Sequence, residues 1–245
     1  MRYKITIEYN GSNFHGWQKQ RHSTNSIQEI IENAIANFSG EKISLHCGGR
    51  TDAGVHALGQ VAHFDMNKKF DSYKIRNAIN YHLKSVPIVV LNAEIVDNKF
   101  HARFSAKKRH YEYRIINRYA PLALEAGYVW QVFNPLEINI MCKAAEYLLG
   151  KHDLSSFRSR ECQAVSPIRT IDNIEIKQNG SHIYINISAI SFLHNQVRII
   201  VGTLVEFGKK KINPKEMLNI LKQRKRSHAG ITAPSCGLYL LKIDY

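Results

Sequence analysis

Polar and apolar positions alternate along residues 2–9 and then change to a helical period. The alternation predicts a strand, because successive side chains of a strand point to opposite faces. After a polar loop over residues 10–25, Ser26 and Glu29 form a capping box that predicts the start of a helix. Gly40 is expected to end this helix. The apolar stripe of the helix consists of Ile27, Ile30, Ile31, Ala34, Ile35 and Phe38.

The rest of the first half favours further strands and one more helix. Apolar alternation predicts strands at 42–47, 60–65 and 88–96, and a helical pattern covers 72–83. Between the first two of these strands, residues 48–58 are largely polar and contain three glycines, which predicts a loop.

The second half mixes a hairpin with helices. Residues 109–117 alternate as a strand, with Tyr111 on the apolar face. Asn179 and Gly180 separate two alternating segments, which is a strong hairpin signal. Further predicted elements are helices opening at Asn134-Pro135 and Asn213-Pro214, a buried helix over 197–207 and a closing strand over 238–243.

This order of elements favours an α+β fold with antiparallel sheet over a strict alternation of strands and helices. No linker rich in Pro, Gly or Ser divides the chain, but a boundary near Ser105 fits the sequence of elements. We therefore expect an N-terminal subdomain over residues 1–105 and a C-terminal subdomain over residues 106–245.

The charge balance changes the picture from an ordinary globular protein to one with a polyanionic partner. Lys and Arg total 34 against 20 Asp and Glu, which gives a net charge of +14. Such an excess favours nucleic acid, because cations that neutralise phosphates release condensed counterions. The alternative is a basic surface that only follows a basic proteome. The basic clusters lie at 107–110, 209–211 and 222–226, and the chain has 12 tyrosines that can stack on bases.

Several classes of protein and site are excluded by what the sequence lacks. No apolar run approaches the ~18 residues of a membrane helix, and the N-terminus has no apolar signal segment, so a soluble cytoplasmic protein is expected. The cysteines are scattered without a C-x-x-C pair, which argues against zinc and disulfides. Glycine motifs for nucleotides and dinucleotides are absent. We expect chemistry by side chains alone, with no metal, cofactor or small-molecule cosubstrate.

The segment 48–56 carries the candidate chemistry. By itself, Asp52 followed by Ala53 and Gly54 predicts a turn, since Asp bonds nearby backbone and Gly adopts positive φ. Three glycines also allow a ligand to approach the backbone, and Arg50 stands two residues from the carboxylate. Such a loop can present a nucleophilic Asp beside a cation that meets phosphate.

At this point the chain resembles the tRNA pseudouridine synthase A family. The resemblance is most specific at Gly49-Arg50-Thr51-Asp52-Ala53-Gly54-Val55-His56. Further blocks follow in the family's order: Tyr9-Asn10-Gly11, Gly16-Trp17-Gln18, Gly59-Gln60-Val61, Phe100 to Ala106, Tyr111-Glu112-Tyr113-Arg114, Val197-Arg198, Val201-Gly202 and Gly237 to Leu240. Gln196 is a mild departure, because Met is expected there.

The resemblance implies that Asp52 is the nucleophile that isomerises uridine to pseudouridine at positions 38, 39 and 40 of the tRNA anticodon stem-loop. The N1–C1′ bond breaks and the uracil is rejoined through C5. The carboxylate can attack C1′ of the sugar or C6 of the base, and the sequence does not choose between them. The family also implies a homodimer and two similar subdomains with the active cleft between them.

The remaining site residues have both a structural and a functional interpretation. From pattern alone, Tyr111 is a core residue, whereas the resemblance implies that it stacks on the uracil. Arg198 lies in an apolar helix and is expected to be half-buried. The resemblance implies Asp52 as its partner, and the alternative is an Arg that extends from the helix edge. Arg50 either contacts RNA or is a solvated loop residue, and Arg103 either pairs structurally or binds RNA.

Two other functions compete with this interpretation. An RNA-binding protein or chaperone of the same fold would do no chemistry, but the set of Arg50, Asp52, Tyr111 and Arg198 argues against it. A methyltransferase acting on RNA would need a methyl-donor site, and no Gly-rich strand–loop–helix supports one. His56 and His63 are predicted to be hydrogen-bonded structural groups.

Overall fold

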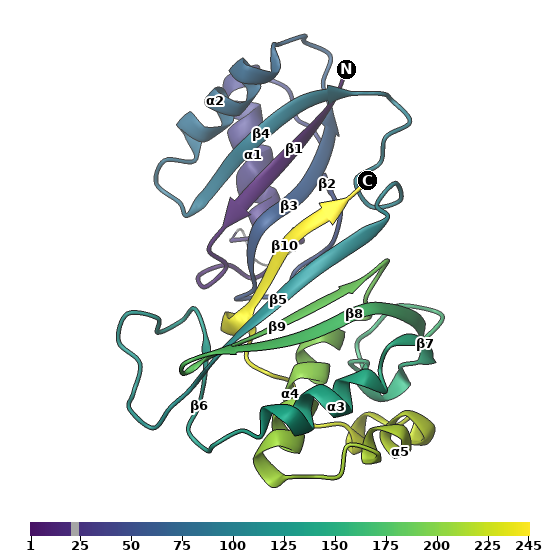
Figure 1. Ribbon diagram of the computed structural model, residues 1–245. Helices are drawn as coiled ribbons and strands as arrows, with labels where there is room; N and C mark the ends of the chain where they lie inside the picture. Colours follow the sequence, from purple (N-terminus) through teal and green to yellow (C-terminus); the bar gives the residue numbers. More distant parts are fainter. Residues whose placement is uncertain (21–24) are drawn as a thin grey trace. The chain divides into compact units, whose positions relative to one another are not determined.

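The computed structural model describes residues 1–20 and 25–245 (Figure 1), so part of the loop expected over residues 10–25 lies outside the described residues. Residues 1–109 and 239–245 form one compact unit, and residues 110–238 form a second. The chain thus leaves the first unit close to the expected boundary at Ser105 and returns to it with its last strand.

The sheet of the first unit has the order β4-β1-β3-β10, and a short strand β2 also pairs with β3. β1 lies antiparallel to β3 and β4, whereas β10 lies parallel to β3. The α+β prediction is confirmed, with a parallel pair added to the antiparallel ones. The strands span β1 (Arg2–Tyr9), β2 (His46–Cys47), β3 (His56–Asp65), β4 (Ile88–Val96) and β10 (Leu238–Asp244).

Two helices, α1 (Ile27–Ser39) and α2 (Ser72–His82), cover one face of these strands (Figure 1). Ser26 caps α1 as predicted, since the Glu29 backbone N–H donates to its Oγ at 3.3 Å. The capping box is only half formed, because the Glu29 carboxylate pairs with Lys19 at 3.3 Å instead of accepting from the Ser26 N–H. Gly40 ends α1 with a φ of +74°, as predicted. The predicted stripe faces the core, and Ile27, Ile31 and Ile35 are fully buried.

Two strand predictions in this unit had wrong limits. Of the strand expected at 42–47, only His46 and Cys47 pair with β3. Just before them, the Leu45 N–H donates to the Glu32 carboxylate of α1 at 3.0 Å, so a helix side chain replaces a ladder partner. β3 begins at His56, earlier than expected, because its first residues pair with β10, which no local pattern reveals.

The second unit has the strand order β5-β9-β8-β7, with β6 parallel to β5. The predicted hairpin is confirmed: Asn179 pairs with His182, and Gly180 between them has a φ of +58°. The short strands β6 and β7 were not predicted. The strands span β5 (Lys108–Asn117), β6 (Trp130–Val132), β7 (Gly150–Asp153), β8 (Ile168–Asn179) and β9 (His182–Ala189).

Three helices of this unit, α3 (Ile138–Glu146), α4 (Gln196–Lys210) and α5 (Glu216–Gln223), gather on one side of its strands (Figure 1). α4 is the predicted buried helix. The predicted cap at Asn134 was wrong, because the Glu137 N–H donates to the Gly208 carbonyl at 3.2 Å and α3 begins only afterwards. Asn213 instead caps a turn ahead of α5, with its Oδ1 accepting from the Lys215 N–H at 3.0 Å.

Candidate active site

Asp52 lies in the loop between β2 and β3. The predicted turn is present: the Val55 N–H donates to the Asp52 carbonyl at 3.2 Å, and Gly54 has a φ of +78°. Asp52 is half-buried, and its neighbour Thr51 is buried. The carboxylate is therefore presented by a defined turn rather than by a solvated loop.

Thr51 anchors the Asp52 turn to the end of β1 and to the loop that follows it. The hydroxyl groups of Thr51 and Tyr9 lie 2.8 Å apart in a buried hydrogen bond. The Thr51 carbonyl accepts a hydrogen bond from the Trp17 N–H at 3.0 Å. Both the side chain and the backbone of the residue before Asp52 are therefore fixed.

Two glycines allow the backbone to approach the Asp52 turn closely. A Cβ on Gly11 would lie 2.0 Å from the Val55 carbonyl oxygen, which no side chain tolerates. A Cβ on Gly16 would lie 2.8 Å from the Thr51 carbonyl oxygen, and the φ of Gly16 is +87°. These glycines belong to the blocks near the N-terminus that carried the sequence resemblance, so the blocks have a structural role here.

The start of the same loop is held by two side chains. Gln60 Nε2 donates to the Gly49 carbonyl at 2.6 Å. The Arg109 guanidinium donates to the Gly48 carbonyl from Nε at 3.0 Å and from Nη2 at 2.6 Å. Arg109 is 8% exposed. Sequence reasoning missed this role, although a cation in phase with the apolar face of a predicted strand was a signal.

Arg50 and Arg103 both have exposed side chains in this unit. Burial raises the pKa of the Cys47 thiol to about 12, while the positive charges of Arg50 and Arg103 act in the opposite direction. Both cations therefore lie near Cys47, an arrangement that the sequence did not reveal. The Arg103 guanidinium also lies 5.6 Å from the centre of the Phe104 ring.

His56 and His63 accept hydrogen bonds from backbone N–H groups. His56 Nδ1 accepts from the Gly11 N–H at 3.1 Å, and its ring stacks on Tyr239 at 4.7 Å. His63 Nδ1 accepts from the Ala102 N–H at 3.1 Å. These bonds fit the prediction that both are structural groups. Burial, followed by the positive charge of neighbouring groups, lowers the pKa of His63 to about 4.

Tyr111 lies on β5 of the second unit and is 8% exposed. Its ring meets the Phe192 ring edge-on, with the centroids 5.2 Å apart. The strand alternates as predicted, so that Tyr113 and Ile115 share the buried face. Tyr111 is thus packed as a core residue within its unit, in an orientation that an aromatic neighbour fixes.

Arg198 lies in the first turn of α4 and is half-buried, as predicted. Its Nε donates to the Ala233 carbonyl at 2.7 Å. Its Nη1 donates to the side-chain oxygen of Asn195 at 2.9 Å. Asn195 precedes the helix with a φ of +61°, and its role was not predicted.

A segment from Gly230 to Pro234 lies along α4 and supplies the Ala233 carbonyl. A Cβ on Gly202 would lie 1.9 Å from the Ile231 carbonyl oxygen, so only glycine allows this approach. The Tyr113 hydroxyl donates to the Pro234 carbonyl at 2.6 Å. Burial raises the pKa of Tyr113, which keeps this donor protonated.

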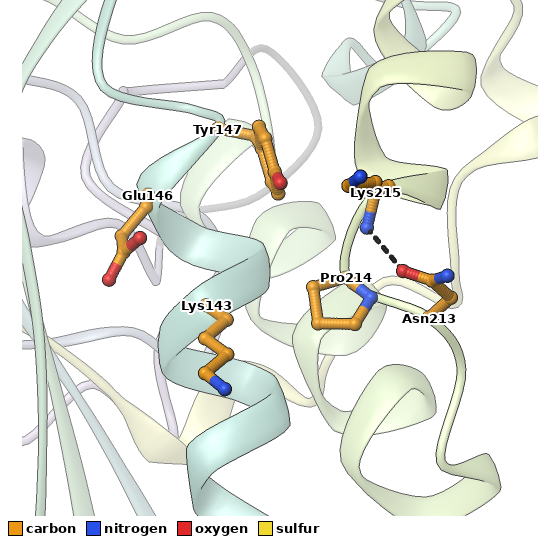
Figure 2. Close-up of a pocket in the computed structure, with 6 residues that line it drawn as sticks. All are labelled: Lys143, Glu146, Tyr147, Asn213, Pro214 and Lys215. Atoms are coloured by element: carbon orange, nitrogen blue, oxygen red, sulfur yellow. Dashed lines mark hydrogen bonds between the residues drawn. The ribbon is translucent and has the colours of Figure 1, made fainter.

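The second unit also has a hollow on its surface, and its lining residues differ from the site residues described above. It measures about 370 Å³ between α3 and the start of α5 (Figure 2). None of the predicted site residues lines it. Its lining consists of Lys143, Glu146, Tyr147, Asn213, Pro214 and Lys215.

The described part of the chain lacks a metal-binding cluster and a membrane-spanning helix. Within residues 1–20 and 25–245, no group of three or more His, Cys, Asp or Glu is placed to hold a metal ion. Over the same residues, no helix has the length and apolar character needed to cross a membrane. The four cysteines are present as thiols.

Comparison with known proteins gives matches along the whole chain. A family model described as tRNA pseudouridine synthase matches residues 5–105 and 144–245, which include Asp52 and Arg198 but not Tyr111. A tRNA pseudouridine synthase A of Wolbachia pipientis wMel is 80% identical over 245 residues. Proteins of the same name from Ehrlichia chaffeensis and Anaplasma phagocytophilum are 62% and 50% identical. Each match covers 100% of both chains.

Proposed function

The chain belongs to the tRNA pseudouridine synthase family, and we propose that it isomerises uridines 38, 39 and 40 of the tRNA anticodon stem-loop with Asp52 as the nucleophile. The observation that carries the proposal is the Asp52 turn, a half-buried carboxylate fixed through Thr51 by β1 and the loop that follows. A nucleophile held in this way loses little freedom when it attacks.

The reaction balances without a second substrate. Asp52 attacks C1′ of the ribose or C6 of the uracil, and the N1–C1′ bond breaks. The detached uracil turns, C5 bonds to C1′, and a base removes the C5 proton while N1 gains one. If Asp52 had attacked C1′, its bond to C1′ breaks as C5 displaces it; if it had attacked C6, it leaves C6 by elimination after the C5 proton is lost, so atoms and electrons are unchanged overall. The target nucleotide must leave the base stack first, because neither carbon is reachable inside a helix.

Tyr111 and Arg198 complete the proposed set. A tyrosine ring with a fixed orientation suits stacking on an extruded uracil. Arg198 supplies a positive charge whose position is set by hydrogen bonds to Ala233 and Asn195. Both roles are tested by substitutions that remove the ring or the charge and keep a side chain of similar length, Tyr111→Leu and Arg198→Met.

Recognition of tRNA is proposed to depend mainly on its backbone. The net charge of +14 and the exposed side chains of Arg50 and Arg103 support phosphate contacts, which are sensitive to salt. We further propose that the chain works as a homodimer in the cytoplasm. Sedimentation at micromolar concentration tests the dimer, and a single monomeric species would refute it.

The direct test is tritium release from tRNA that carries uridine tritiated at C5, with purified protein and no added small molecule. Release together with pseudouridine in the digested tRNA supports the proposal. Absence of release from a protein that still retains tRNA on a filter would instead favour a binding function without chemistry.

A further inference from the structure

We infer that Asn195 is a positioning residue whose side-chain carbonyl holds the Arg198 guanidinium in its working orientation. The inference rests on the proposed role of Arg198 in the reaction. The two residues are three positions apart at the start of α4, and Arg198 Nη1 donates to Asn195 Oδ1 at 2.9 Å.

Asn195 supplies an anchor for one nitrogen of the Arg198 guanidinium, and a second anchor acts on another nitrogen of the same planar group. The second anchor is the Ala233 carbonyl, which accepts from Arg198 Nε at 2.7 Å. The backbone of Ala233 is itself fixed, because its N–H donates to the Arg198 carbonyl at 3.1 Å. With two nitrogens bound to separate acceptors, the plane of the guanidinium is held in one orientation.

The backbone of Asn195 departs from that of an ordinary residue at the start of a helix. A residue at the start of a helix ordinarily has extended backbone and uses its side chain to accept from the N–H groups of the first turn. Asn195 instead has φ +61° and ψ +7°, and its side chain makes no such bond. Asn is among the few residues other than Gly that adopt this conformation readily.

The side chain of Gln196, and not that of Asn195, bonds to the backbone just before α4. Its Oε1 accepts from the Leu193 N–H at 2.7 Å, and the residue is 1% exposed. The chain therefore fits Gln at the position where Met was expected, by using the amide to hold the turn that precedes α4. Among the described hydrogen bonds, the Asn195 side-chain oxygen therefore accepts from Arg198 only.

The inference predicts a loss of rate with little loss of binding. Without the Asn195 acceptor, Nη1 of the guanidinium loses a fixed partner, and misplacement by about 1 Å can lower a rate about 100-fold. The dissociation constant of tRNA should stay within about twofold, because phosphate contacts dominate affinity.

Three variants separate the side chain from the backbone. Asn195→Gly keeps the left-handed conformation but removes the acceptor, and Asn195→Asp keeps both. Asn195→Ala removes the acceptor and strains the backbone. Lys211→Gly is the matched control for strain, since Lys211 ends the same helix with a φ of +52°. It reports what relief of left-handed strain, together with loss of the exposed Lys211–Glu137 ion pair, does to the melting temperature.

The first measurement is single-turnover pseudouridine formation by the full chain, beside tRNA retention on filters. A rate about 100-fold lower for Asn195→Gly, restored mostly in Asn195→Asp, supports the inference. A wild-type rate in Asn195→Gly overturns it, and so does a rate in Asn195→Asp as low as in Asn195→Gly.

A second measurement does not depend on activity. The Arg198 side-chain N–H signals in nitrogen-15 NMR spectra, assigned with Arg198→Lys, report whether the guanidinium rotates. If rotation is hindered in the wild type and becomes free in Asn195→Gly, the positioning role of Asn195 is supported. Unchanged rotation overturns it. If the wild type released no tritium, the proposed function would be refuted. The NMR spectrum would still show whether Asn195 restrains the Arg198 guanidinium.

Discussion

The Asp52 turn and the Arg198 side chain are held in place by different physical means. Around Asp52, Gly11 and Gly16 bring backbone against backbone at distances that no Cβ permits. Around Arg198, the fixed element is a side chain, bound by the Ala233 carbonyl and the Asn195 amide. A steric fit fails almost completely when one atom is added, whereas a hydrogen-bonded anchor can be weakened in steps. The predictions below test this difference, beginning with the largest expected effect.

Gly16→Ala should damage the Asp52 turn severely. The added Cβ would lie 2.8 Å from the Thr51 carbonyl oxygen at a φ of +87°. We expect unfolding free energy to fall by about 3 kcal/mol and turnover by about 100-fold. Gly127→Ala is the matched control, because Gly127 has a φ of +85° with nothing within 4 Å of the added atom. It should cost only about 1 kcal/mol, and equal effects of the two variants in urea unfolding would refute the steric account.

Arg109→Met should weaken the same loop at its start. The substitution leaves the Gly48 carbonyl without the two donors that now reach it from a buried guanidinium. We expect a loss of about 2–3 kcal/mol in urea unfolding, together with lower activity. Arg118→Met is the control, since the exposed Arg118 also donates to two carbonyls, of Ala120 and Pro121. A similar loss from both variants would show that burial does not matter.

Acid should destabilise the first unit through His63. Its pKa is about 4 when folded, against 6.5 in the unfolded chain, because burial, His101, Arg2 and His46 outweigh the opposing charge of Asp65. The unfolded state therefore binds the proton first, and stability present above pH 6.5 falls as the pH drops towards 4. The full loss is about 3 kcal/mol.

Unfolding free energies of the wild type and of His63→Gln at several pH values measure this contribution. The variant should be less stable at neutral pH and lose less on acidification. A slope unchanged by the substitution would assign the acid sensitivity to other groups.

Tyr113→Phe should have the smallest effect. It removes only the donor to the Pro234 carbonyl and keeps the buried ring. We expect a loss of about 1 kcal/mol in thermal or urea unfolding and little change in rate, because the Ala233 anchor remains. A large drop in turnover at unchanged stability would mean that the Gly230 to Pro234 segment has a more direct part in the reaction.

The sequence predicted those features whose causes are local. The N-cap at Ser26, the stripe of α1 and the turn at Gly180 depend on residues a few positions apart, and the structure confirms each. The α+β class followed from these elements. The limits predicted for two strands were wrong because their causes are not local. The start of β2 depends on Glu32 of α1, and the start of β3 depends on β10 at the end of the chain.

For the candidate site, the resemblance identified the residues proposed for the chemistry but not the residues that hold them in place. Asp52, Tyr111 and Arg198 were named from motifs, and their roles stay predictions. Arg109 was missed because its acceptor is 61 residues away in the chain. Asn195 was missed because nothing in the neighbouring sequence indicates a residue with left-handed backbone before a helix.

The central claim is that Asp52 is the nucleophile, and the most direct measurement is the activity of Asp52→Asn at unchanged binding. The amide keeps the shape of the side chain but removes the attacking charge. The account predicts wild-type tRNA retention and melting temperature, with tritium release lowered at least about 1,000-fold. Release by Asp52→Asn at a rate near that of the wild type would contradict the account, because another group would then have to attack the uridine.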